Sequence, residues 1–170
     1  ALYKSAWAYY NVEDYRGSLQ RFAEVIEFAT QNPNAFDGQN LARQARKELV
    51  TPYSRVGTPE RALDFFGRYA QNREQALEML ESLADLYFDT GQWVKAITTY
   101  HKLMVEAPNS DKLCNWESKV AHAVIAQGNK RNTVDELRRL VQTYERFVSQ
   151  PNRPPEAVRA CKGGTAGVLY

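Results

Sequence analysis

Residues 77–110 constrain the fold of this chain more than any other stretch, because they combine two amphipathic segments, a glycine between them and a proline at the end. In each segment apolar and small side chains recur every three or four residues, which is the spacing of one helix face. Ala84 and Ala96 are small enough for two such helices to approach closely, with Gly91 in the turn. The stretch predicts a helical hairpin with an inner face of Leu80, Leu83, Ala84, Tyr87, Trp93, Ala96, Ile97, Tyr100 and Leu103.

The same pattern recurs along the chain, which indicates a repeat. An interval of 34 residues relates the aromatic, glycine and alanine positions of this hairpin to Tyr53, Gly57, Ala62 and Phe66. A longer interval relates Tyr53 and Phe66 to Tyr9 and Phe22, so an insertion is expected between the first two units. Gly128 marks a degenerate fourth unit. The predicted organisation is an array over residues 1–150, with repeats at about 1–32, 43–76, 77–110 and 111–150, an insertion at 33–42, and a proline-interrupted break with a C-terminal helix at 151–170.

The order W/L-x2-L-A/G-x2-Y, turn glycine, A-x3-Y/F and proline resembles the tetratricopeptide repeat (TPR). This resemblance implies an all-α fold, a right-handed α-solenoid of about four antiparallel helical hairpins. One hairpin cannot bury its apolar face alone, so the hairpins are expected to stack into a curved array with a concave and a convex side. Members of the family bind other proteins, so the resemblance implies that a partner peptide or helix lies in the concave groove.

In the family the first helix of each repeat lines the groove, and the resemblance implies which side chains do so here. The expected groove has an aromatic end, a basic step and an acidic patch. Its partner-binding positions are Tyr3, Trp7, Tyr10, Asn11, Lys47, Thr51, Arg55, Glu78, Glu81, Asp85, Phe88, Asp89 and His122. Two alternatives stay open: the acidic residues form a solvated helix face, or the rings pack against a preceding repeat.

Some members of the family grip a C-terminal carboxylate with Lys, Asn and Arg at defined inner positions. In this sequence those positions hold Tyr3, Trp7, Glu48, Glu78 and Ser82. The carboxylate clamp is absent, and an Hsp70- or Hsp90-type carboxylate tail is not an expected partner.

Three phrases look like TPR proteins of the bacterial cell envelope, including those of gliding-motility and trans-envelope assemblies. The similarity implies a multiprotein complex of the envelope, in the periplasm. The phrases are LYKSAWAYYNVEDYRGSLQRF, ESLADLYFDTGQWVKAITTYHKL and TVDELRRLVQTYERF.

Local signals predict several helix ends in the first half of the chain. Asp14 is expected to cap a helix over 15–31, and Thr58 followed by Pro59 to open another. Residues 32–40 are rich in helix breakers and are expected to form a long connection. Pro52 is expected to kink or shorten a helix over 41–55.

Similar signals appear in the second half. Asn109 or Ser110 is expected to cap a helix that ends near residue 127. Thr133 and Glu136 have the spacing of a capping box and are expected to open the next helix. A last helix over 156–170 is expected to be weakened by Gly163 and Gly164.

Charge and hydropathy restrict the partners. The chain has 22 Lys and Arg against 20 Asp and Glu, a formal net charge of +2. This balance does not favour nucleic acid or an anionic membrane as the main partner. No apolar run reaches the length of about eighteen residues that a membrane-spanning helix needs. Because the chain begins at Ala1 within an apolar face, it is expected to be a fragment whose signal or anchor lies outside it.

Candidate reactive residues are few. Cys114 and Cys161 lie far apart in the sequence and are expected to be separate thiols, with a disulfide in an oxidising compartment as the alternative. His101 is expected on a helix surface, with a pH-sensitive contact as the alternative. The GGTAG segment lacks the lysine and preceding strand of a phosphate loop. No catalytic residue, metal ligand or cofactor is therefore expected.

The sequence thus predicts a non-catalytic scaffold for protein–protein interaction. Two other hypotheses stay open. One is an accessory or sensor domain of a larger enzyme or envelope-polymer-binding protein, and the other is a self-associating structural oligomer.

Overall fold

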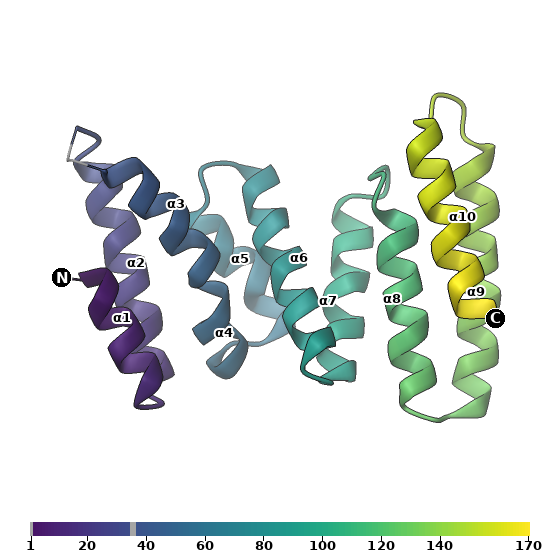
Figure 1. Cartoon of the computed structure of the whole chain (residues 1–170), viewed down its shortest axis with the longest axis horizontal. Coiled ribbons are helices and arrows are strands. Elements are labelled where there is room, and N and C mark those ends of the chain that lie inside the picture. The colour runs from purple at the N-terminus through teal and green to yellow at the C-terminus, as the bar shows by residue number, and fades with distance from the viewer. Residues whose placement is uncertain (1, 35–36) are drawn as a thin grey trace. The chain divides into compact units, whose positions relative to one another are not determined.

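The computed structural model of the chain describes residues 2–34 and 37–170. These residues form ten helices and no strand, which confirms the predicted all-α fold of TPR-like helical hairpins (Figure 1). The chain divides into two compact units, of which the first ends at Leu86 and the second begins at Tyr87. The boundary between the units therefore lies within helix α6 (Arg73–Asp89). No helix of the described residues is long and apolar enough to cross a bilayer.

The first unit is built around α2. Helices α1 and α2 form an antiparallel hairpin, and α3, α4 and α5 also contact α2 (Figure 1). Phe22, Leu49 and Phe66 are fully buried in its core. The predicted cap of α2 is confirmed, because the Asp14 carboxylate accepts a hydrogen bond of 2.8 Å from the Gly17 amide. The helices are α1 (Leu2–Asn11), α2 (Tyr15–Gln31), α3 (Gly38–Glu48), α4 (Val50–Val56), α5 (Pro59–Tyr69) and the first part of α6.

The helix predicted over residues 41–55 is in fact two helices. Helix α3 begins earlier, at Gly38, and the break before α4 lies at Leu49 rather than at Pro52. Pro52 falls in the first turn of α4, where a backbone N–H has no partner within the helix, so proline is tolerated there. The predicted connection over residues 32–40 is shortened by the early start of α3, and residues 35–36 lie outside the described residues.

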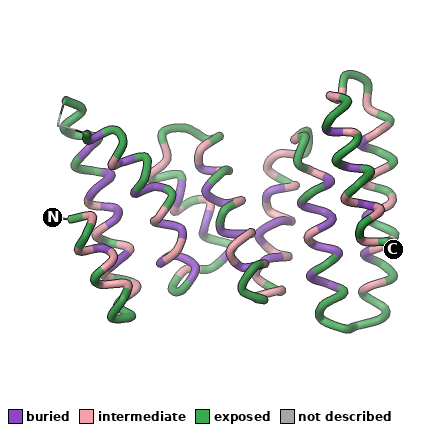
Figure 2. Tube along the Cα trace, viewed as in Figure 1, coloured by how far each residue is buried: buried purple, intermediate pink, exposed green. Residues whose placement is uncertain are grey.

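The second unit is built around α8, which contacts α7, α9 and α10 (Figure 1). Buried residues occur along most of α8, whereas α10 is largely exposed (Figure 2). Gly91 has a φ of +70°, a left-handed conformation that favours glycine, so the predicted turn before α7 is confirmed. The helices are the end of α6, α7 (Trp93–Glu106), α8 (Leu113–Ala126), α9 (Lys130–Ser149) and α10 (Pro155–Leu169).

The predicted starts of α8 and α9 are wrong. Helix α8 begins at Leu113 rather than directly after Asn109 or Ser110.

Helix α9 begins at Lys130, because Asn129 acts as its N-cap and accepts a hydrogen bond of 3.1 Å from the Asn132 amide. The predicted capping box therefore lies inside the helix. There the Thr133 hydroxyl donates to the Asn129 carbonyl, and Glu136 is buried.

Cys114 and Cys161 form a disulfide, so the expectation of two separate thiols is wrong. The bond joins the start of α8 to the middle of α10 across 47 residues of sequence, with the two Cα atoms 5.1 Å apart. Ala157 and Phe147 pack with the two cysteines in a buried cluster. The sequence does not reveal the pair, because the two cysteines meet only when α10 folds back onto α8.

Candidate partner-binding surface

The predicted aromatic end lies on α1. The Trp7 ring makes edge contacts with Tyr10 and Phe22, each with ring centroids 5.5 Å apart. Tyr3 makes a similar contact with Phe22 at 5.8 Å. All three predicted residues are half-buried, while Asn11 at the end of α1 is exposed. The rings therefore help to hold the α1–α2 hairpin together and present only part of their surface.

The predicted basic residues are Lys47 on α3 and Arg55 on α4. Side chains of these two helices make two contacts with α1 and α2. The Tyr3 hydroxyl donates a hydrogen bond of 2.9 Å to Glu48, and burial raises the pKa of Tyr3. The Arg55 guanidinium lies 5.6 Å from the ring centroid of Tyr15, and a hydrogen bond with Tyr10 raises the pKa of Arg55. Aromatic and basic side chains of the predicted groove are thus brought together in the first unit.

A cavity of about 320 Å³, the α3–α6 cavity, brings Lys47 and Glu78 to one opening. Both side chains are exposed and were predicted to line the groove. Because Lys47 is positively charged and Glu78 is negatively charged, the opening can pair with both acidic and basic groups of a polar segment. Its lining consists of Arg43, Arg46, Lys47, Val50, Gln75, Glu78, Met79 and Ser82.

The remaining predicted residues are divided between the two units. Glu81 and Asp85 are half-buried in the first unit and make interactions of their own. Phe88 belongs to the second unit, where its ring contacts Trp93 with centroids 5.5 Å apart. Three further positions are Thr51, half-buried on α4, and Asp89 and His122, which are exposed on α6 and α8.

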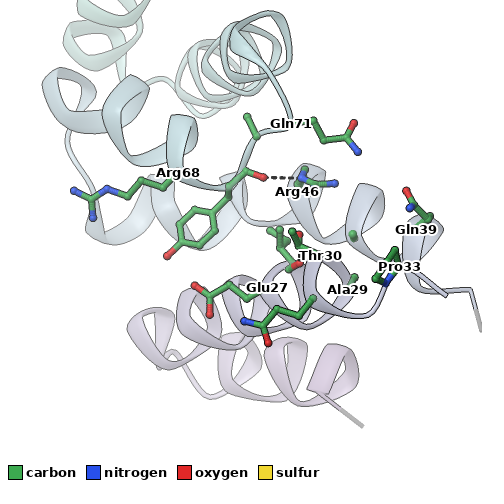
Figure 3. Close-up of a pocket in the computed structure, with 13 residues that line it drawn as sticks. Glu27, Ala29, Thr30, Pro33, Gln39, Arg46, Arg68 and Gln71 are labelled. Carbon is green, nitrogen blue, oxygen red and sulfur yellow. Dashed lines mark hydrogen bonds between the residues drawn. The ribbon is translucent and has the colours of Figure 1, made fainter. Parts of the chain in front are cut away.

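A second cavity of the first unit was not predicted from the sequence. It measures about 490 Å³ and is bordered by α2, α3 and α5 (Figure 3). We name it the Arg46 cavity, because the Arg46 side chain lies in its wall and is only 6% exposed. Its lining consists of Ile26, Glu27, Ala29, Thr30, Gln31, Pro33, Gln39, Ala42, Arg46, Arg68, Tyr69, Ala70 and Gln71.

Within the described part of the chain, the Arg46 side chain makes one hydrogen bond, at the end of α5. Its Nε donates to the Tyr69 carbonyl oxygen at 2.6 Å (Figure 3). No carboxylate of the described residues forms an ion pair with it, and burial lowers its pKa. One sequence signal could have revealed this residue: Arg46 falls on the same helix face as Ala42, Ala45 and Leu49, where an apolar side chain is expected.

The second unit contains a group of titratable residues from three helices, which we name the carboxyl cluster: the buried Glu117 and Glu136, the half-buried His101 and the exposed Arg139. Glu117 is 2% exposed and Glu136 is 6% exposed. Arg139 donates a hydrogen bond of 3.2 Å to Glu136 Oε2. Burial, together with the neighbouring carboxyl group of Glu136, raises the pKa of Glu117 to about 8.

His101 is half-buried on α7, and its Nε2 atom is buried without a hydrogen-bond partner among the described residues. Burial lowers the pKa of His101, against the opposing effect of Glu136. The His101 ring therefore lies partly in the interior of the second unit and not wholly on the helix surface. Within residues 2–34 and 37–170, no group of three or more His, Cys, Asp or Glu side chains is arranged to hold a metal ion.

A family model described as the tetratricopeptide repeat matches residues 82–110. The match covers the end of α6, all of α7 and the turn that follows, within the hairpin predicted over residues 77–110. Repeats of this family generally mediate protein–protein interaction. The chain matches none of the curated proteins with which it was compared.

Proposed function

We propose that this chain is a non-catalytic scaffold that binds a peptide or helix of a partner protein along the first helices of its repeats. The observation that carries this proposal is the α3–α6 cavity, where the predicted groove residues Lys47 and Glu78 line one opening. The family match over residues 82–110 supports the same function. A surface of packed helices loses little conformational entropy on binding, so complementarity alone provides affinity.

We further propose that the scaffold works in the bacterial cell envelope, in the periplasm. The disulfide between Cys114 and Cys161 supports this location, because disulfides persist in oxidising compartments and are rare in the cytosol. The sequence resemblance to gliding-motility and trans-envelope proteins supports a place in an assembly of that kind. Alkylation of thiols in intact cells tests the location: protection of both cysteines until a reductant is added is expected, and two free thiols would contradict it.

Photo-crosslinking in the native cells tests the interaction surface. A photoreactive residue is placed in turn at Lys47, at Glu78 and at Glu74, which is exposed on α6 but does not line the cavity. The same partner is expected to crosslink from positions 47 and 78 and not from 74.

A charge reversal completes this test. Glu78→Lys is expected to weaken crosslinking from position 47, whereas Glu74→Lys leaves it unchanged. Crosslinking from position 74 alone, or equal effects of the two reversals, would show that the partner binds elsewhere.

A further inference from the structure

We propose that the Arg46 cavity is a binding site for a carboxylate group of a partner polypeptide. The inference rests on the proposed scaffold function, for which it names the chemistry of a contact. It does not depend on Lys47 or Glu78, which lie outside this cavity, although Arg46 itself also lines the α3–α6 cavity. Arg46 is also none of the positions at which the family's carboxylate clamp would lie.

The first argument is the buried charge of Arg46. A buried cation without a counter-ion is strongly unfavourable, and natural proteins normally pair it. The carbonyl oxygen of Tyr69 compensates part of the charge, because it lies at the negative end of α5. That bond occupies Nε, and the two Nη atoms form no hydrogen bond with residues 2–34 or 37–170. These two atoms form a planar fork that matches the two oxygens of a carboxylate.

The second argument is the charge of the cavity. Its formally charged lining residues are Arg46, Arg68 and Glu27, which leave one net positive charge. Gln39, in the first turn of α3, also borders the cavity, and a helix N-terminus favours anions. A single positive charge matches a carboxylate, which carries one negative charge, better than a phosphate, which carries nearly two at neutral pH.

The third argument is space. About 490 Å³ falls within the range of small-molecule pockets, roughly 300–1,000 Å³, and is enough for an amino-acid side chain or a chain end with its flanking peptide group. Thr30 and Gln71 line the same cavity as Arg46 (Figure 3). The side-chain amides of Gln31, Gln39 and Gln71 provide hydrogen-bonding groups for the peptide groups next to the carboxylate.

The test is titration of the full chain with small probes, monitored by the NMR signals of the Arg46 Nε–H group and of the Gln39 side-chain amide, which lines the cavity and is retained in every variant. N-acetyl-glutamate amide represents an acidic side chain, N-acetyl-alanine a chain end, and N-acetyl-glutamine amide the neutral isostere. At least one carboxylate probe is expected to bind about tenfold more tightly than the neutral isostere, which corresponds to about 1.4 kcal/mol. The preferred carboxylate then identifies a side chain or a chain end as the group. Equal binding of the neutral isostere, or tighter binding of inorganic phosphate, would overturn the proposal.

Variants identify the residue responsible. Arg46→Gln is expected to reduce the affinity for the carboxylate probe by at least about tenfold. Arg61→Gln removes the same charge from an exposed position on α5, outside both cavities, and is expected to change this affinity less than twofold. Undiminished binding by a folded Arg46→Gln variant would overturn the assignment.

A second variant keeps the proposal testable if Arg46→Gln fails to fold. Gln71→Glu adds a carboxylate to the lining of the cavity, which cancels its net positive charge. It is expected to reduce probe affinity about tenfold. Unchanged probe affinity in Gln71→Glu would contradict a site at Arg46. These experiments use only the chain and small probes, whereas the crosslinking experiments use Lys47 and Glu78, which do not line the Arg46 cavity. Failure of one test therefore does not decide the other.

Discussion

Glu117 on α8 and Glu136 on α9 are both buried in the interior of the second unit, where burial and the neighbouring Glu136 carboxyl group raise the pKa of Glu117 to about 8. Arg139 donates a hydrogen bond to Glu136, and burial favours the protonated form of Glu117. His101 lies on α7 in the same electrostatic environment. The stability of this unit is therefore linked to pH at two groups, and the two effects have opposite signs.

The first prediction concerns Glu117, whose pKa rises from 4.5 to about 8 on folding. Between these values the folded chain holds a proton that the unfolded chain has released. The free energy of unfolding therefore falls as pH rises from about 4.5 to about 8, by up to about 1.4 kcal/mol per pH unit. Glu117→Gln is expected to remove this slope in urea unfolding measured from pH 5 to 9. Glu145→Gln, an exposed change on α9, is the control, and a Glu117→Gln profile identical to it would refute the prediction.

The second prediction concerns His101, whose pKa is lowered from 6.5 by burial. Below pH 6.5 the unfolded chain takes up a proton that the folded ring resists, so the free energy of unfolding falls as the solution becomes more acidic. His101→Gln is expected to flatten this acid side of the stability profile. His122→Gln, on the exposed face of α8, should leave it in place. Equal behaviour of the two variants would show that His101 does not respond to its burial.

The third prediction concerns the disulfide. Closing a loop of 47 residues reduces the entropy of the unfolded chain. Replacing both cysteines with serine is therefore expected to lower the stability of the second unit by about 4 kcal/mol. Hydrogen exchange should show the loss first in α10, which has few buried residues, and no change in the α1–α2 hairpin. Retained protection of the α10 amides would mean that packing alone holds this helix.

The fourth prediction compares two neighbouring glycines of α10. A Cβ atom at Gly163 would meet nothing within 4 Å, so Gly163→Ala is expected to stabilise the helix by about 0.5–1 kcal/mol. A Cβ atom at Gly164 would lie 3.0 Å from the Ser118 hydroxyl oxygen, which donates to the Cys114 carbonyl. Gly164→Ala should therefore gain less, or lose stability. Equal gains in thermal unfolding would show that α10 does not depend on this close approach to α8.

The sequence predicted the parts of the fold that depend on local chemistry. The cap at Asp14, the turn at Gly91 and the helix start at Pro59 each follow from a side chain and its near neighbours. The same reasoning failed at Thr133 and Glu136, because Asn129 one turn earlier already caps α9 and Glu136 is needed inside the unit.

The candidate sites were harder to predict than the helices. Lys47 and Glu78 follow from their repeat positions, and the structure places both at one cavity. Arg46 is buried because the end of α5 lies against it. A pattern of apolar residues in the sequence does not predict this contact. The partner of Cys114 likewise depends on how α10 packs, which no local signal reports.

The Cys114–Cys161 bond also determines how the second unit would transmit mechanical load. Tension applied at the two ends of the chain would pass from α8 to α10 through the sulfur atoms and bypass α9. The 47-residue separation represents roughly 160 Å of extended chain that cannot be drawn out while the bond is intact. In an assembly that bears force, this end of the chain would behave as a short tether whose extensible length depends on the oxidation state of one pair of cysteines.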